Sequence, residues 1–316
     1  MSNSIATTSA AAPTTAHVAF DFAQVDVFAE RPLEGNQLAI FTDARGLSTE
    51  EMQALARETN LSETTFILPR EPEVECERGV QVRIFTVQEE LRFAGHPTLG
   101  TASWLYWNHP VQRGAEQITL DLPVGPISVR FTPPQANKHG VFGTMKQNDP
   151  VFGDIHDRAA LAAVLNLSVD DLDPDLPAQT VSTGMAFCIV PLRSLEVASR
   201  LAIPQHAAKA YLNRSDAKFF HCITRADQAS VADWHARMQF YNGEDPATGS
   251  ASGCTIAWLV RHGLVASGQQ MVIEQGIEMR RPSRIYVSAK IAGDTVSEVF
   301  VGGRTIPVAM GRFFLP

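Results

Sequence analysis

Cysteine is scarce in this chain of 316 residues, and its four copies stand far apart. None of them forms a Cys-x-x-Cys pair, so the sequence predicts neither a zinc knuckle nor a disulfide framework. Reduced thiols are typical of the cytoplasm, which is where we expect the protein to act. The nine histidines form no His-Glu-x-x-His motif or comparable cluster, so no metal site is predicted.

The chain also has few positively charged residues and few long apolar runs. The chain has 26 Lys and Arg against 34 Asp and Glu, a net charge of −8, and no basic stripe with interleaved aromatic residues. Such a chain repels a phosphate backbone, so we expect a small-molecule partner and no nucleic acid. No stretch approaches the roughly 18 apolar residues of a membrane span. Residues 1–18 lack the basic and apolar regions of a signal peptide and are predicted to be a disordered tail.

The remaining composition is that of a globular protein, with 45% hydrophobic and 19% charged residues. Its length predicts about two domains. The region 132–150 is rich in Pro, Gly and Asn and has no clear periodicity, so we place the domain boundary there. The predicted N-terminal domain covers 19–132 and the C-terminal domain 145–303, and the last strand, 304–316, is a candidate to complete the first domain.

Strands are predicted to outnumber helices. Apolar and polar residues alternate over 19–29, which indicates a strand. Ser48 and Glu51 form a capping box at the start of a helix whose inner face carries Met52, Leu55 and Ala56. A second helix is predicted at 194–202. Further strands are predicted at 38–41, 61–68, 80–87, 179–192, 217–224, 236–242, 271–291, 296–303 and 305–315.

The later half of the chain repeats the order of elements in the earlier half. Arg237 follows Arg83 by 154 positions, and Pro246 follows Pro97 by 149. The near-constant offset favours a duplicated unit, although small residues and proline are common at helix starts and chance similarity is the alternative.

Two helices of this repeat carry no charged residue, over 97–108 and 246–260. A helix that is apolar on nearly all sides is expected to be surrounded by protein, which in a strand-rich domain means a sheet wrapped around it. Each helix is predicted to open with its proline, capped by the preceding His96 or Asp245.

Small residues follow each proline and leave the first-turn N–H groups open to a ligand. A helix N-terminus has positive dipole character and binds anions, so we expect a carboxylate there. If the halves are duplicates, the two helix starts face each other and bring His96 and Asp245 into one site. For either residue alone, a purely structural capping role is the alternative. The small residues are Thr98, Gly100, Thr101, Thr248, Gly249 and Ser250.

Glu63 is the third candidate for proton chemistry. In the predicted strand it shares a face with Thr65 and Ile67, where an ionised carboxylate is costly unless it is paired. Burial of this kind raises a carboxyl pKa toward the range that a general acid or base needs. The alternative is a solvated face, with Phe66 and Leu68 on the core side instead.

These residues lie in five motifs that together resemble the phenazine-biosynthesis PhzF-like isomerase family, which has the diaminopimelate epimerase-like fold. The resemblance runs from about Phe22 to the last strand. The motifs are "DVFAERPLEGNQLAIF", "NLSETTFILP", "FAGHPTLGTA", "EDPATGSASG" and "EQGIEMRRPSRI".

The resemblance implies an α+β fold of two similar domains, each a mostly antiparallel curled sheet around a central helix. It implies catalytic roles for Glu63, His96 and Asp245, no metal or organic cofactor, and a homodimer. The residues that it places on the substrate are Asn36, Ser62, Gly95, Thr248, Gly249 and Ser250.

The activity that we expect from this resemblance is proton transfer within a small unsaturated carboxylic acid, such as a dihydro-hydroxyanthranilate, with Glu63 acting on one face. Epimerisation or racemisation of an amino or hydroxy acid is an alternative, with Asp245 or His96 opposite Glu63. A non-catalytic carboxylate-binding protein is another. Racemisation by two thiols is not expected, because His96 and Asp245 replace the cysteines that related epimerases carry at the helix starts.

Two positions depart from the family pattern. Val87 stands where members commonly have proline, and Arg280 stands where they have glycine. Arg280 changes local shape and charge, so it is a candidate determinant of which substrate fits.

A Gly-x-Ser-x-Gly hydrolase motif is excluded because the middle residue of "GSASG" is Ala251.

Overall fold

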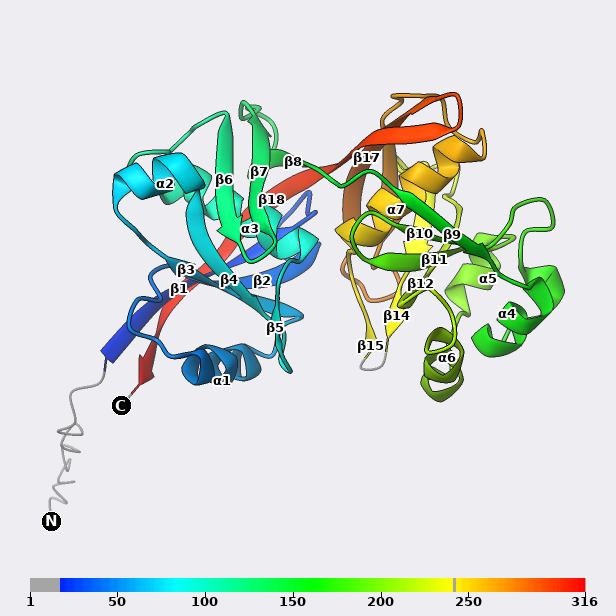
Figure 1. Cartoon of the computed structure of the whole chain (residues 1–316), viewed down its shortest axis with the longest axis horizontal. Coiled ribbons are helices and arrows are strands. Elements are labelled where there is room, and N and C mark those ends of the chain that lie inside the picture. The colour runs from blue at the N-terminus through cyan, green and yellow to red at the C-terminus, as the bar shows by residue number, and fades with distance from the viewer. Residues whose placement is uncertain (1–17, 241–242, 316) are drawn as a thin grey trace, which may run out of the picture.

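The computed structural model describes residues 18–240 and 243–315 and has an α+β fold with few helices (Figure 1). The predicted tail 1–18 lies outside the described residues except for its last position. Sixteen strands form one continuous sheet, in the order β1-β2-β3-β4-β6-β7-β8-β18-β17-β16-β13-β12-β11-β10-β9, with β5 paired to β4. No helix in this part of the chain is long and apolar enough to cross a membrane.

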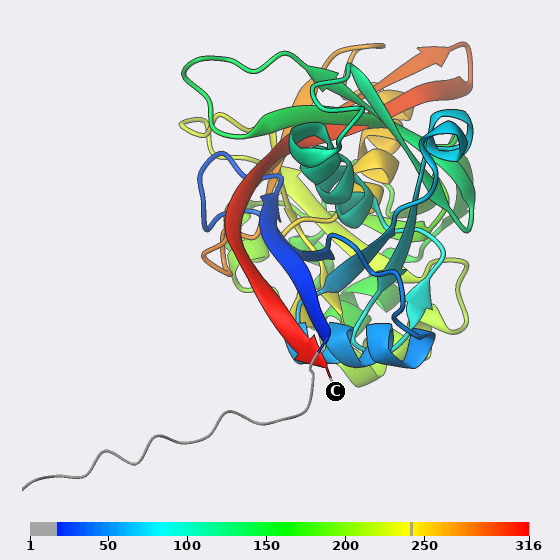
Figure 2. The ribbon, with the colours of Figure 1, turned by 90° about the vertical axis from the view of Figure 1, so that its left-hand side faces the viewer.

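Eight of these strands close into a barrel, because β18 pairs with β8 over one part of its length and with β1 over another. Figure 2 shows β1 and the end of β18 lying side by side along one wall of this barrel. The eight strands are β1 (Val18–Val27), β2 (Asn36–Phe41), β3 (Glu63–Leu68), β4 (Val80–Phe85), β6 (Gln117–Leu122), β7 (Gly125–Thr132), β8 (Val141–Lys146) and β18 (Thr295–Leu315).

Helix α3 (Gly95–Asn108) lies inside this barrel, and its residues from Gly95 to Leu105 are all buried. The absence of charge on this segment fits that position, because no face of it meets water. At Gly100 the helix comes so close to β1 and β2 that an added Cβ would lie 2.6 Å from Leu38 and 2.8 Å from Val27. The sequence therefore correctly predicts this helix as a buried one.

The remaining strands curve around helix α7 (Gly249–Arg261), whose residues are buried almost throughout. The pairing directions of this series repeat those of the barrel: parallel, antiparallel and parallel from β11 to β16, as from β2 to β6. Its strands are β9 (Val151–Ile155), β10 (Gln179–Ser182), β11 (Ala186–Pro191), β12 (Phe219–Arg225), β13 (Trp234–Arg237), β16 (Met271–Gln275) and β17 (Ser283–Ala292).

Shorter helices pack against strands of the sheet, among them β3, β4, β6 and β12. The capping box of α1 is confirmed, with Ser48 and Glu51 exchanging both bonds and Met52, Leu55 and Ala56 buried. These elements are α1 (Thr49–Thr59), α2 (Pro72–Arg78), α4 (Arg158–Leu165), α5 (Leu195–Ser199), α6 (Gln205–Leu212), the 3-10 turn Val169–Asp171, and the two-residue strands β5 (Glu90–Leu91), β14 (Gln239–Phe240) and β15 (Gly243–Glu244).

Several predicted boundaries are wrong. The single strand expected over 179–192 is a hairpin, because the chain turns between β10 and β11 and the two strands pair with each other. Strand β8 lies within the region 132–150 that has no clear periodicity. One of its inward positions is Gly143, which hides the alternation and packs close to Leu99. The predicted strand 236–242 ends in Tyr241 and Asn242, which lie outside the described residues.

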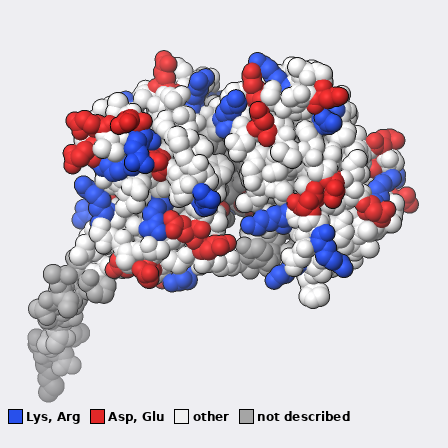
Figure 3. Space-filling model, in the orientation of Figure 1, with Lys and Arg blue, Asp and Glu red and all other residues white. Residues whose placement is uncertain are grey.

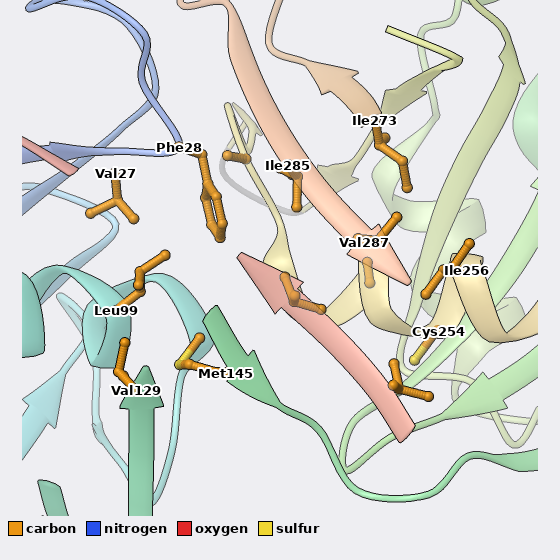
Figure 4. Close-up of a cluster of buried hydrophobic side chains, with 14 of the residues drawn as sticks. Val27, Phe28, Leu99, Val129, Met145, Cys254, Ile256, Ile273, Ile285 and Val287 are labelled. Atoms are coloured by element: carbon orange, nitrogen blue, oxygen red, sulfur yellow. The ribbon is translucent and has the colours of Figure 1, made fainter. Parts of the chain in front are cut away.

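Phe28 joins the core around α3 to the core around α7. Figure 4 shows its ring between Val27 and Leu99 on one side and Ile285 on the other. The ring is fully buried, and a Cβ added at Gly249 or Gly303 would lie 3.0 Å or 2.5 Å from it. One hydrophobic cluster therefore continues from the barrel into the second series of strands.

Candidate active site

Three of the predicted site residues meet at the junction of the two strand series. Asn36 opens β2, His96 lies in the first turn of α3, and Asp245 precedes α7. The Nδ2 atom of Asn36 donates to Oδ1 of Asp245 at 2.7 Å and to the carbonyl of Ala247 at 3.0 Å. It also lies 3.4 Å from Nδ1 of His96. Asn36 thus connects the start of α3 with the segment before α7.

Glu63 is the first residue of β3 and faces His96, with Oε2 3.6 Å from Nε2 of the imidazole. Burial and, as a smaller contribution, the nearby carboxylate of Asp245 together raise the pKa of the Glu63 carboxyl to about 8. Burial lowers the pKa of His96 to about 3, against an opposing contact with the backbone of Gln37. Both groups are therefore mainly neutral at pH 7, and this close contact is not a salt bridge.

The Nε2 atom of His96 is buried and has no hydrogen-bond partner in the part of the chain that the structure describes. Buried polar groups without a partner are uncommon in folded proteins, and each one needs an explanation. Here the free atom is directed at the carboxyl of Glu63. A ligand atom that approaches Nε2 beside the Glu63 carboxyl would satisfy it.

Asp245 is held by a set of short hydrogen bonds. Its Oδ2 accepts from the hydroxyl of Thr248 at 2.6 Å, and its Oδ1 accepts from Asn36. Burial raises the pKa of Asp245 to about 6, and the bonds from Thr248, Asn36 and the backbone of Ala247 keep it from rising further. At neutral pH this carboxyl is mainly ionised, whereas Glu63 is mainly protonated.

The starts of α3 and α7 face each other. A Cβ added at Gly95 would lie 3.6 Å from the backbone nitrogen of Ser250, so these two first turns are in close approach. Neither helix has a side-chain cap: the N-cap residues are Ala94 and Thr248. Uncapped first-turn N–H groups from two helices therefore point into one region, which suits an anion.

The predicted capping roles of His96 and Asp245 are therefore wrong. His96 lies inside the first turn of α3, and Asp245 lies four residues before the first residue of α7. The physical reason is that both side chains have tertiary partners. Asp245 binds Asn36, which is 209 positions away in the sequence, and His96 faces Asn36 and Glu63.

The predicted substrate-binding residues differ in their surroundings. Ser62 is exposed and directly precedes Glu63, and Ser250 is half-buried at the start of α7. Gly249 is buried against the ring of Phe28, which leaves no room for a side chain. Thr248 is buried, and its hydroxyl is engaged by Asp245.

Sequence reasoning missed Gln275, the last residue of β16. Its amide is fully buried and binds the backbone of Asp245 and Thr248. The motif "EQGIEMRRPSRI" contains this residue and was the available signal.

Three cavities of about 310, 370 and 350 Å³ lie away from all of these site residues. No group of three or more His, Cys, Asp and Glu within 18–240 and 243–315 is arranged to hold a metal ion.

A family model described as "Phenazine biosynthesis-like protein" matches residues 25–311. The chain belongs to this PhzF family. It is 36% identical over 294 residues to a trans-2,3-dihydro-3-hydroxyanthranilate isomerase of Pseudomonas aeruginosa, a match that covers 92% of this chain and 98% of the relative. It is 32% identical to an uncharacterised isomerase of Mesorhizobium japonicum, over 92% of this chain and 97% of that one.

Solved structures of this family have the same fold. A PhzF-family protein of Bacillus anthracis superimposes with a TM-score of 0.81 at 25% identity, covering 94% of this chain and all of that one. A hydroxyproline epimerase of Agrobacterium vitis, only 9% identical with a TM-score of 0.63, shares the fold over 94% of this chain and 93% of its own. With relatives named as isomerases over nearly its full length, this PhzF-family chain is an isomerase.

Proposed function

We propose that this isomerase moves a proton within a small unsaturated carboxylic acid by general acid and base catalysis, without a cofactor. The observation that carries the proposal is the mostly buried Glu63 carboxyl, whose side chain is 17% exposed and whose pKa is raised to about 8, facing the unpartnered Nε2 of His96. A group whose pKa lies near the working pH exists in both protonation states, and so it can both remove and return a proton.

In the proposed reaction Glu63 acts twice. Its ionised form removes a proton from an activated C–H bond of the substrate, and the resulting acid returns the proton to another carbon on the same face. One carboxyl serves two carbons because the bound substrate holds both of them within its reach. His96 donates from Nε2, or accepts at Nε2, according to its tautomer and so orients the substrate against Glu63.

The substrate carboxylate would occupy the region between the starts of α3 and α7. Backbone N–H groups near Gly95 and Ser250 are available there, and the dipoles of two buried helices favour negative charge at that place.

The relative from Pseudomonas aeruginosa supplies the first substrate to test, trans-2,3-dihydro-3-hydroxyanthranilate. At 36% identity the shared reaction class is better supported than the shared substrate. A panel should therefore also hold other small diene and aromatic-like carboxylic acids.

Epimerisation is the second candidate, favoured by one observation. The pKa values of Asp245 and Glu63 are raised to different values, about 6 and about 8, so at pH 7 one carboxyl is a base and the other an acid. A base and an acid on opposite sides of a carbon would invert it. Chiral chromatography of amino and hydroxy acids tests this, since inversion without movement of a double bond favours epimerisation.

The decisive experiment follows product formation in deuterium oxide with mass detection. We expect wild-type protein to convert the substrate with at most one deuterium gained at the accepting carbon, and Glu63→Gln to lose roughly 100- to 10,000-fold in rate. The matched control is Glu75→Gln, because Glu75 is also buried beside a histidine, His109, at 3.0 Å but far from the site. Equal rates for Glu63→Gln and wild type would refute the role of Glu63.

We further propose that the barrel around α3 and the strands around α7 are two similar domains of a duplicated unit. The repeated pairing directions support this. A homodimer is proposed from the family resemblance, and sedimentation velocity tests it. The cytoplasmic location stays a prediction.

A further inference from the structure

Gln275 makes three hydrogen bonds to the segment that carries Asp245. Its Nε2 donates to the backbone carbonyl of Asp245 at 2.7 Å and to the hydroxyl oxygen of Thr248 at 2.9 Å. Its Oε1 accepts from the backbone N–H of Thr248 at 3.2 Å. The side chain is completely buried at the end of β16, so water does not compete for these bonds.

These partners determine which way the amide points. A backbone carbonyl only accepts and a backbone N–H only donates, so Nε2 must face Asp245 and Oε1 must face the nitrogen of Thr248. The Thr248 hydroxyl then accepts from Gln275, and its own hydrogen is free for another acceptor. That acceptor is Oδ2 of Asp245, at 2.6 Å.

His221 extends this chain on its far side. It is fully buried on β12, and its Nε2 lies 3.5 Å from Oε1 of Gln275 while its Nδ1 lies 2.7 Å from the hydroxyl of Thr255. Burial lowers the pKa of His221 to about 4, so the ring is neutral at pH 7. Because Oε1 only accepts, the proton is on Nε2 and Thr255 donates to Nδ1.

The hydrogens therefore all point the same way, from Thr255 through His221, Gln275 and Thr248 to the carboxylate. We propose that Gln275 and His221 are positioning residues that direct the Thr248 hydroxyl at Asp245 and hold this carboxylate ionised and in one orientation. Aligned hydrogen bonds polarise each other in a buried environment, which strengthens the last bond of the series. Thr248 then serves Asp245, and not the substrate as the family resemblance implies.

Other groups also face Asp245 and must be controlled. Glu244 is adjacent and raises the pKa of Asp245, and the carboxyl of Glu63 interacts with it electrostatically. Asn36 donates to its other oxygen and connects it to His96, which is neutral. The consequence of this positioning for catalysis rests on the proposed function, but the hydrogen-bonded arrangement does not.

The test is a titration of Asp245 by NMR, with aspartate labelled with carbon-13 at the carboxyl carbon. The resonance is assigned by its loss in Asp245→Asn. Each variant is titrated in a Glu63→Gln background, because two interacting carboxyls titrate as a pair. We expect Thr248→Val to raise the pKa of Asp245 by about one unit and Gln275→Met by about half a unit, since each removes ordered hydrogen-bond donation.

Gln179→Met is the matched control. Gln179 is also a buried glutamine whose amide bridges a backbone carbonyl, that of Gly153 at 3.1 Å, and a histidine, His262 at 3.2 Å. Its replacement should leave the titration of Asp245 unchanged, and Thr248→Ser should restore the wild-type value. An unchanged pKa in Thr248→Val overturns the proposal, as does an equal shift in Gln179→Met. An unchanged pKa of Asp245 in Gln275→Met also overturns it, and if that variant does not fold, His221→Phe is titrated in its place, because it removes the donor to Oε1 of Gln275.

No substrate enters this titration. Failure of the proposed reaction and failure of the positioning role are therefore separate results.

Discussion

The carboxyl of Glu63 and the imidazole of His96 lie 3.6 Å apart as two neutral groups. Such a pair usually forms a salt bridge in water, but here burial raises the pKa of the acid and lowers that of the base. The pair therefore presents hydrogen-bonding groups, and little net charge, to a ligand that lies beside it. This arrangement suits a carbon acid, because proton transfer from carbon needs a base that is poorly solvated by water.

The rate should rise with pH as Glu63 ionises. Because the proposed reaction begins with the carboxylate of Glu63, whose pKa is about 8, we expect kcat/KM to increase about tenfold per pH unit below that value and to level above it. The measurement is kcat/KM for trans-2,3-dihydro-3-hydroxyanthranilate between pH 5.5 and 9.5. A profile that falls above about pH 8 would mean that the acid form starts the reaction.

Asp245→Asn supplies the control for that assignment. Asp245 is a negative charge that raises the pKa of Glu63, so its removal should shift the rising limb to lower pH even where the maximal rate falls. If the rising part of the kcat/KM profile stays at the wild-type pH in Asp245→Asn, a group other than Glu63 controls that rise.

Glu63→Gln should stabilise the protein at alkaline pH. The pKa of Glu63 is raised from 4.5 to about 8 on folding, so the folded state favours the protonated form. As pH rises from about 4.5 to about 8, the unfolded chain ionises first and the free energy of unfolding of wild type falls; glutamine does not titrate. We expect the free energy of unfolding of Glu63→Gln to exceed that of wild type by on the order of a few kcal/mol at pH 9, and the two to be equal near pH 4.5. Urea denaturation at the two pH values measures this difference.

Glu75→Gln distinguishes this effect from a general response to amidation. Glu75 binds His109 at 3.0 Å, and its replacement removes half of a buried pair without a role in the site. A stability gain at pH 9 in this variant equal to that of Glu63→Gln would contradict the assignment to Glu63.

Sequence patterns predict the fold best where the stabilising interactions join residues that are close in the sequence. The capping box of Ser48 and Glu51 needs only four consecutive residues, and the absence of charge over 97–108 already requires a buried helix. Strand β3 shows the limit of such reasoning: it is buried on both faces, so Thr65 and Phe66 are both core residues and neither predicted face is a solvated one.

Long-range hydrogen bonds could not be predicted in the same way. A polar side chain before a helix can hydrogen-bond to the first turn of that helix as a cap or to a residue distant in the sequence. Only the tertiary structure decides between these two partners. Asp245 takes Asn36 as its partner, and Gln275 reaches back 30 positions to the carbonyl of Asp245. The family resemblance supplied Asn36 and Asp245 as site residues, and one of its motifs contains Gln275, but no pattern of residues indicated which groups the Gln275 amide binds.

Arg280→Gly should stabilise the protein modestly. Arg280 has a φ of 58°, in the left-handed region that glycine adopts freely, and it stands where the family commonly has glycine. Relief of the left-handed conformation, offset by the greater freedom of glycine in the unfolded chain, should give a gain of about 0.5–1 kcal/mol. Thermal unfolding measures it. Arg280→Ala, which removes the charge but keeps the strained conformation, should give no gain.

Arg281 connects the segment after β16 to the loop that precedes Asn36. Its Nη2 donates to Oδ1 of Asp26 at 2.7 Å and to the carbonyl of Glu34 at 2.6 Å, and its Nε donates to the carbonyl of Gly35 at 2.8 Å. Asp26 is almost fully buried, and burial raises its pKa despite the guanidinium. Arg281→Met would leave that carboxyl without its charge partner.

We expect Arg281→Met to lower the free energy of unfolding by about 3 kcal/mol at pH 7, because removing one member of a buried pair leaves an uncompensated charge. This loss of stability should grow as pH rises. Without Arg281 the pKa of Asp26 in the folded protein is raised further, whereas Asp26 in the unfolded chain ionises at its ordinary, lower pKa. Arg312→Met is the control: Arg312 binds Asp21 at the same 2.7 Å, but both side chains are more than half exposed. Exposed pairs contribute about 0–1 kcal/mol, so equal losses in the two variants would refute the argument from burial.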